Sequence, residues 1–132
     1  MNELSVVLPV HNESKTLLKT LQEIDEALSF IDYEFILSED GSVDNTVEVM
    51  NDAEKIFNLR FITSKKRKGY AKAVIDAIKL VNTKYVIFMD SDGQIDPKYI
   101  EALWNGRNKY DINIGYRKVR ADSIIRLIYK LN

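Results

Sequence analysis

The chain alternates short apolar runs with segments that carry the period of an amphipathic helix. The apolar runs cover residues 4–9, 33–38, 59–63, 84–89 and 112–115. Four of them are too continuous for strands exposed on one face, which indicates strands covered on both faces. Apolar residues recur at helical spacing in 17–28, 46–57 and 71–81. Alternation with short connections predicts an α/β, Rossmann-like fold, with a mostly parallel sheet, right-handed crossovers and helices on both faces.

Residues that commonly begin helices agree with this pattern. Ser42 or Asp44 is expected to cap the second helix, and Asp96 before Pro97 fits an N-cap followed by a proline in the first turn. The third helix is expected to begin near Gly69. Its apolar stripe is predicted to consist of Ala71, Val74, Ile78 and Val81.

The 132 residues predict one domain, and the absence of Cys excludes a disulfide framework, a thiolate metal site and a Cys nucleophile. The net charge of −1 argues against a nucleic-acid binder. The charges are nevertheless segregated: residues 1–59 hold three lysines and 13 acidic residues, and 60–132 hold 16 basic and seven acidic residues. Halves of opposite sign indicate a basic surface that faces an anionic partner; the alternative is that both halves are simply solvated.

The sequence contains no apolar run of 18 residues and no basic segment before its first apolar stretch. A membrane-spanning helix and a signal peptide are therefore not expected, which favours a cytoplasmic location. The segment 121–132 combines apolar residues with Arg120, Arg126 and Lys130 nearby. It is predicted to be an amphipathic helix that lies on an anionic membrane surface or packs on its own domain.

Chemistry-bearing residues follow the predicted strands, where ligands bind in sheets of this kind. Asp90 and Asp92 come directly after the fourth strand, and two carboxylates one residue apart can both reach one hard cation. The alternative is a solvated turn, because Asp-Ser-Asp-Gly is also good turn chemistry. Asp40 follows the second strand, where its carboxylate can accept hydrogen bonds from a nucleobase.

Basic residues follow the third and fifth strands. The run 65–68 lies between a strand and a helix. It is either a solvated loop or, because it precedes a helix N-terminus, a loop that binds an anion. Arg117 is likewise either a solvated surface charge or a residue that contacts a phosphate through two hydrogen bonds. His11 is the only histidine, so a catalytic triad and a zinc site are both rejected.

Five segments together resemble family 2 glycosyltransferases with the GT-A fold, most of all the dolichyl-phosphate mannose synthase branch. They are 7–13, 39–46, 67–71, 90–94 and 115–117, each at the end of a predicted strand. The resemblance implies a nucleotide-diphospho-sugar donor (GDP- or UDP-sugar), Mg²⁺ or Mn²⁺, and transfer with inversion. It also implies a polyprenyl or dolichyl phosphate as acceptor, with the domain at the cytoplasmic membrane face.

The resemblance also implies roles for individual residues. Asp90, Asp92 and Gln94 would hold the metal, with Asp92 and Arg117 the residues closest to catalysis. The donor would be bound by a larger set that reaches from the first strand to the fifth, namely Pro9, His11, Glu13, Asp40, Lys68, Asp90 and Arg117.

Two further readings follow from the length and the strand ends. Family domains usually continue for about another hundred residues, so residues 1–132 are expected to form the donor-binding part, with the acceptor half shortened or missing. The alternative function is a nucleotide-sugar-binding module without transferase activity of its own. A phospho-receiver domain would instead need acidic residues at the end of the first strand and an Asp at the end of the third, where this chain has Asn12-Glu13 and Ser64-Lys65.

Overall fold

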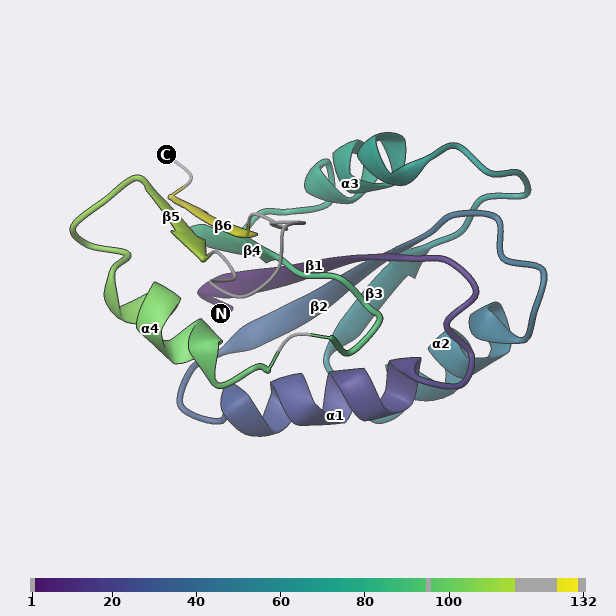
Figure 1. Cartoon of the computed structure of the whole chain (residues 1–132), viewed down its shortest axis with the longest axis horizontal. Coiled ribbons are helices and arrows are strands. Elements are labelled where there is room, and N and C mark those ends of the chain that lie inside the picture. Colours follow the sequence, from purple (N-terminus) through teal and green to yellow (C-terminus); the bar gives the residue numbers. More distant parts are fainter. Residues whose placement is uncertain (1, 95, 116–125, 131–132) are drawn as a thin grey trace.

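A six-stranded sheet forms the centre of the chain (Figure 1). The computed structural model describes residues 2–94 and 96–115 and the backbone of 126–130. The strands are β1 Leu4–Val10, β2 Tyr33–Glu39, β3 Leu59–Ile62, β4 Tyr85–Phe88, β5 Ile112–Gly115 and β6 Arg126–Lys130. The helices are α1 Leu17–Ala27, α2 Thr46–Glu54, α3 Tyr70–Ile78 and α4 Tyr99–Asn105. All five strands expected from the sequence are present, with ends shifted by at most a few residues.

The order of the strands is β3-β2-β1-β4-β6-β5, and the first four run parallel. The chain therefore moves outward from β1 to β3 on one side and continues from β4 on the other. This reversal places the topological switch point between β1 and β4, where an α/β sheet opens a crevice at its carboxyl edge. β6 is antiparallel to both of its neighbours, so β5 runs in the same direction as β4. The expected mostly parallel sheet is confirmed.

The amphipathic helix predicted for 121–132 is wrong where the structure describes that segment, because residues 126–130 form β6. Its register pairs Tyr85 with Lys130 and Ile112 with Tyr129. Apolar residues such as Leu127 and Ile128 suit a strand between two others as well as a helix face, and pairing with β4 and β5 decides between them. The rest of the segment lies outside the described residues.

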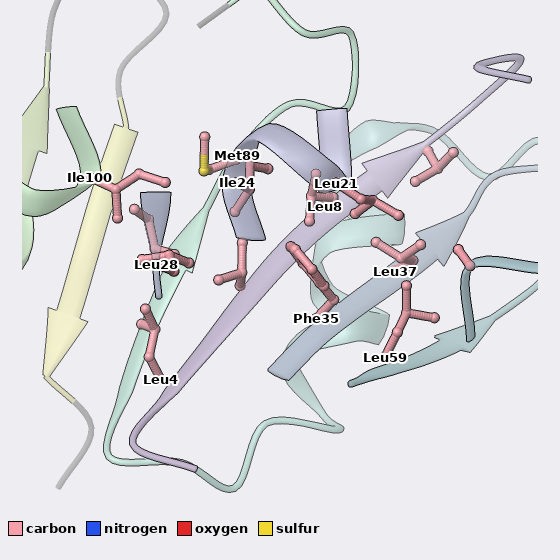
Figure 2. Close-up of a cluster of buried hydrophobic side chains, with 14 of the residues drawn as sticks. Leu4, Leu8, Leu21, Ile24, Leu28, Phe35, Leu37, Leu59, Met89 and Ile100 are labelled. Carbon is pink, nitrogen blue, oxygen red and sulfur yellow. The ribbon is translucent and has the colours of Figure 1, made fainter. Parts of the chain in front are cut away.

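Helices cover both faces of the sheet, as expected. On one face, α1, α2 and α4 pack against the larger core (Figure 1). Figure 2 shows Leu21 and Ile24 of α1 over the central strands, with Leu21 next to Leu8 of β1 and Phe35 of β2 below them. On the other face, α3 contacts β1 and β2, and a smaller cluster forms around Ala77. β1 and β2 are buried between these layers, whereas β3 and β5 at the sheet edges are partly exposed.

The orientation of α3 differs from the predicted apolar stripe. Ala73 and Ala77 are fully buried against the sheet, whereas Ala71 and Ile78 are exposed. Alanine leaves the helix backbone close to the sheet, where Val7 and Ile36 fill the space beneath it. Val81 of the predicted stripe packs against this cluster, whereas close approach of helix and sheet selects Ala73 and Ala77 in place of Ala71 and Ile78.

The helix starts also show which cap candidate acts. Asp44 accepts a hydrogen bond from the Thr46 amide at 3.0 Å, whereas the Ser42 hydroxyl accepts one from the Asn12 amide at 2.9 Å. Asp96 accepts a hydrogen bond of 3.0 Å from the Lys98 amide, in the turn that leads into α4. Of the two candidates for α2, Asp44 therefore holds the first residue of the helix from the position before the N-cap Asn45, and Ser42 joins two loops. In the part of the chain that the structure describes, no helix combines the length and the hydropathy needed to cross a bilayer.

Candidate functional site

The loops that follow β1, β2 and β3 lie together at one end of the molecule, at the carboxyl edge of the sheet (Figure 1). The β1 loop is tied to the β2 loop through Asn12, which has a left-handed backbone (φ 50°). Its amide donates to Ser42, and its Oδ1 accepts from the Val43 amide at 2.9 Å. Asn tolerates this conformation better than other side chains with a Cβ. The two loops therefore form one surface.

His11 is oriented by hydrogen bonds on both ring nitrogens. Nδ1 donates to the backbone carbonyl of Asp40 at 2.9 Å, which leaves Nε2 as the acceptor for the Asn12 side-chain amide at 3.1 Å. Glu13 accepts a hydrogen bond of 2.6 Å from Thr16 at the start of α1. Pro9 lies buried in β1. Of these three predicted donor-binding residues, His11 and Glu13 lie at the edge of the sheet and Pro9 lies beneath it.

Asp40 is almost fully buried, and its carboxylate holds the loop that precedes α3. Oδ1 accepts hydrogen bonds from the backbone amides of Lys68 at 2.6 Å and Gly69 at 3.3 Å. Oδ2 lies 3.5 Å from the Arg67 guanidinium. The basic run predicted to bind anions is therefore anchored by the carboxylate predicted to bind the base.

Gly41 allows the same two loops to approach closely. Its backbone is left-handed (φ +64°), and a Cβ there would lie 2.6 Å from the backbone of Lys66 and Arg67. Glu39 adds a second link that the sequence did not single out. It is 1% exposed and accepts hydrogen bonds from the Ser42 amide and, at 3.2 Å, the Ser64 amide. The signal in the sequence that could have identified Glu39 was a carboxylate at the end of a continuous apolar run.

The side chain of Lys68 lies along α3. Its Nζ donates to Asp76 at 2.9 Å, and Lys72 donates to the same carboxylate at 2.6 Å. These hydrogen bonds from Lys72 and Lys68 hold the pKa of Asp76 well below its ordinary value. In this geometry the Lys68 backbone faces Asp40 and its ammonium faces the helix.

The acidic turn after β4 is fixed across the switch point by the residue between its two carboxylates. Ser91 is buried and donates a hydrogen bond of 3.0 Å to the Pro9 carbonyl of β1. Its own carbonyl accepts from Thr20 of α1 at 3.4 Å. The sequence pattern pointed to Asp90 and Asp92 and not to Ser91, although the central place of Ser91 in the motif was a signal.

Asp90 and Asp92 are both half-buried at this edge. Asp90 accepts a hydrogen bond of 3.4 Å from the Tyr70 hydroxyl, so the acidic turn contacts the first residue of α3. Asp92 accepts one of 3.0 Å from the Gln94 amide. Gln94 is exposed and lines a hollow of about 760 Å³ between α1 and the loop before α4.

The carboxylates of this turn suit a hard cation whose coordination is completed by ligands from outside the protein. In the described ranges, no three His, Cys, Asp or Glu side chains gather as a metal cluster. Mg²⁺ takes one or two protein carboxylates and fills its remaining positions with water and phosphate oxygens. Asp90 and Asp92 supply oxygen donors of that kind. Arg117, the remaining predicted site residue, lies outside the described residues.

The fold defines a class of protein. A Rossmann-like sheet with its switch point between β1 and β4 is the fold of GT-A glycosyltransferases. Structure comparison supports this assignment of fold: S. aureus TarS 1–349 in complex with UDP-GlcNAc aligns with a TM-score of 0.71 and 19% identity, over 92% of this chain and 36% of that one.

The profile of Glycosyl transferase family 2 matches residues 5–127, and the chain belongs to this family. The dolichol-phosphate mannosyltransferase of Pyrococcus furiosus is 33% identical in an alignment of 126 positions that covers 92% of this chain and 35% of the relative. The mannosyltransferase PcManGT of Pyrobaculum calidifontis, in complex with GDP-Man and Mn²⁺, aligns with a TM-score of 0.60 and 21% identity over 69% of this chain and 28% of that one. The chain thus spans about a third of the length of these proteins.

Proposed function

We propose that this chain is the donor-binding domain of a metal-dependent, inverting glycosyltransferase. Its donor is a nucleotide-diphospho-sugar with guanine or uracil as base, and its acceptor is a polyprenyl or dolichyl phosphate. The domain works at the cytoplasmic face of a membrane. The mannosyltransferase and TarS complexes, with GDP-Man and UDP-GlcNAc, support the donor class. The Pyrococcus furiosus relative supports the acceptor class.

The observation that carries the proposal is the contact between the acidic turn and the start of α3. Tyr70 joins Asp90 to the helix whose preceding loop holds three lysines and an arginine. The predicted cation site and the predicted anion-binding loop therefore contact each other at one edge of the sheet, which supports the proposal. A metal-bound diphosphate presents both charges, negative phosphate oxygens and a divalent cation, within one ligand.

Asp90 and Asp92 would hold Mg²⁺ or Mn²⁺, with Gln94 as a further oxygen donor. When bound, the cation offsets the negative charge that develops on the diphosphate leaving group. Ser91 keeps both carboxylates in place, because its hydrogen bond to Pro9 attaches the turn to β1.

The nucleoside would lie over the β1 and β2 loops, where His11 and Glu13 are exposed in part. Asp40 would contact the base with acceptor capacity that its present partners leave. A carboxylate offers about four acceptor sites. The present partners of Asp40 are two backbone amides and one guanidinium, so part of this capacity remains. His11 Nδ1 is already engaged, so its ring would take part by stacking.

In the transfer step, an oxygen of the acceptor phosphate attacks C1 of the sugar and forms the new C1–O bond. The bond between C1 and the donor diphosphate breaks, its electron pair leaves with the nucleoside diphosphate, and the configuration at C1 inverts. A phosphomonoester has a second pKa near 6, so it is largely ionised at neutral pH and needs no general base. Arg117 would pair with the diphosphate or with the acceptor phosphate.

The alternative is a module that binds the donor without transferring sugar by itself. The observation that favours it is that the candidate residues which the described strand ends bring together, His11, Asp40 and Asp90, are all candidates for binding the donor or its metal.

Isothermal titration with GDP-mannose and UDP-GlcNAc, with Mn²⁺, Mg²⁺ or EDTA, tests the donor. We expect binding of one donor that requires the metal. A transfer assay with polyprenyl phosphate then separates the two functions, because binding without product supports the module. Absence of binding to either donor under all metal conditions would contradict both.

A further inference from the structure

Helix α3 presents its larger apolar side chains to solvent. Its sheet-facing residues are Ala73 and Ala77, whereas Ile75 and Ile78 are 50% and 44% exposed. Tyr70 in the first turn is also exposed. A surface helix ordinarily turns its apolar stripe to the core and its polar residues to water. Isoleucines on the outer face of α3 therefore indicate a partner outside the sheet.

The edge strand β5 adds two isoleucines on the same side of the sheet. Asn113 and Gly115 face α4. A Cβ on Gly106, which follows the last residue of α4, would lie 2.9 Å from the Asn113 side chain. A Cβ on Gly115 would lie 4.0 Å from Leu103 of α4. Successive residues of a strand point to opposite faces. Ile112 and Ile114, both about half exposed, therefore point away from α4, to the side on which α3 lies (Figure 1).

Helix α3 and the segments that flank it are rich in basic residues. Residues 60–84, which comprise β3, α3 and their loops, contain eight lysines and arginines and one acidic residue. That acid, Asp76, is paired with Lys68, Lys72 and Lys79. Lys65 and Lys66 are exposed in the loop before the helix. The side of the sheet that carries α3 is therefore strongly positive.

The opposite side is negative. α1 and α2 together contain six acidic residues and one lysine. Helices α1 and α2, from the acidic half of the sequence, thus lie on the opposite side of the sheet from α3, which comes from the basic half. A molecule with this polarity turns one particular side toward an anionic surface.

We infer that the α3 face, defined as Tyr70, Ile75, Ile78, Ile112 and Ile114 with the basic residues 65–67, binds the surface of an anionic lipid bilayer. Apolar side chains flanked by lysines fit the boundary between lipid headgroups and acyl chains. A nucleic acid would satisfy the lysines and leave the isoleucines in water. A second copy would bring two positive faces together. The inference deepens the proposed function, on which the link to a lipid-linked acceptor rests.

The absence of Cys allows a direct measurement on the chain. Ile78→Cys would carry one environment-sensitive fluorophore on the α3 face, and Ile56→Cys, at a site 66% exposed beyond α2, would carry it on the opposite side. With vesicles of phosphatidylcholine and phosphatidylglycerol, we expect a blue shift from position 78 and none from 56. Equal shifts at both positions, or no shift at 78, would overturn the inference.

Vesicle co-sedimentation with matched variants tests the two parts of the surface. Ile75→Ser with Ile78→Ser, and separately Lys65→Glu with Lys66→Glu, are expected to weaken binding about tenfold or more. The controls are Leu18→Ser with Ile56→Ser and Lys19→Glu with Lys55→Glu, which make the same changes on the α1 and α2 side. Controls that lose as much binding would contradict the assigned face.

Two further measurements distinguish lipid binding from nucleic-acid binding, and the inference from the proposed function. Binding to a nucleic-acid duplex that is as tight as vesicle binding and unaffected by the Ile75 and Ile78 changes would overturn the lipid assignment. Donor titration with the same double-serine variant is expected to match the unchanged chain. Loss of vesicle binding with intact donor binding is the result we expect for that variant, and failure of donor binding in the unchanged chain would reject the proposed function alone.

Discussion

The carboxylate of Asp40, at the end of β2, accepts a hydrogen bond of 2.6 Å from the backbone amide of Lys68, 28 residues further along the chain. This contact attaches the basic loop to the centre of the sheet and sets where α3 begins. It makes Asp40 a positioning residue for the loop as well as a candidate for base recognition.

Asp40→Ala is expected to lower the free energy of unfolding by about 2–3 kcal/mol, because it leaves the Lys68 and Gly69 amides without their acceptor. Asp40→Asn keeps an acceptor oxygen and loses the attraction to Arg67, so it should cost about 1 kcal/mol. Urea denaturation measures both. Tryptic cleavage in the 65–68 loop should rise in the alanine variant; equal stability and cleavage in all three proteins would contradict the anchoring role.

Gly41→Ala is expected to displace the basic loop, because the new Cβ would lie 2.6 Å from the backbone of Lys66 and Arg67. Gly69→Ala is the matched control, since its φ is also positive (+89°) but nothing lies within 4 Å of a Cβ there. Both changes should cost about 1–3 kcal/mol of backbone strain. Only the Gly41 variant should also weaken donor binding in calorimetry, and an equal loss in both would point to strain alone.

Asp92→Ala is expected to abolish cation-dependent donor binding and to leave the fold nearly intact, because the side chain lies at the sheet edge and packs little core. Asp52→Ala, an exposed acid on α2, is the control for the lost charge. Calorimetry with Mn²⁺ gives the affinity, and circular dichroism checks the fold. A variant that bound donor with unchanged metal dependence would show that Asp92 is no ligand.

Ser91→Ala is expected to cost about 1 kcal/mol of stability, since it removes the hydrogen bond to the Pro9 carbonyl. The larger effect should be on metal affinity, because Asp90 and Asp92 lose the attachment between them. Ser91→Thr keeps the hydroxyl and serves as the rescue variant. Metal affinity that stays unchanged in the alanine variant would remove Ser91 from the positioning set.

Stability is expected to fall as the pH drops from about 4 toward 2. Hydrogen bonds from Thr46 and Ser14 lower the pKa of Asp44 to about 2 from its ordinary value of 3.8. A carboxyl whose pKa is lower in the folded state contributes stability above its unfolded pKa and loses it as it becomes protonated. Asp44→Asn should therefore show a smaller difference in urea midpoint between pH 7 and pH 3. An equal fall of the urea midpoint with pH in both proteins would exclude Asp44 as a source of the loss of stability at low pH.

Much of the site followed from strand ends that the sequence marks clearly. Asp40 and the Asp90–Asp92 pair directly follow continuous apolar runs, and strands that run parallel bring their carboxyl ends to one edge whatever their lateral order. The partners of these residues could not be read in the same way. Glu39, Ser91 and Tyr70 act through contacts with residues 25, 82 and 20 positions away, with Ser64, Pro9 and Asp90 respectively.

The sequence by itself determined the alternation of strands and helices, the positions of the acidic and basic loops, and the unequal charge of the two halves. These depend on local periodicity and composition, which a single chain segment carries alone. The tertiary structure decided that 126–130 pairs as a strand, that α3 buries alanines and exposes isoleucines, and that the acidic helices α1 and α2 lie on the opposite side of the sheet from α3. Those outcomes depend on which surfaces meet, because a side chain is stabilised by burial only where another element is close enough to exclude water.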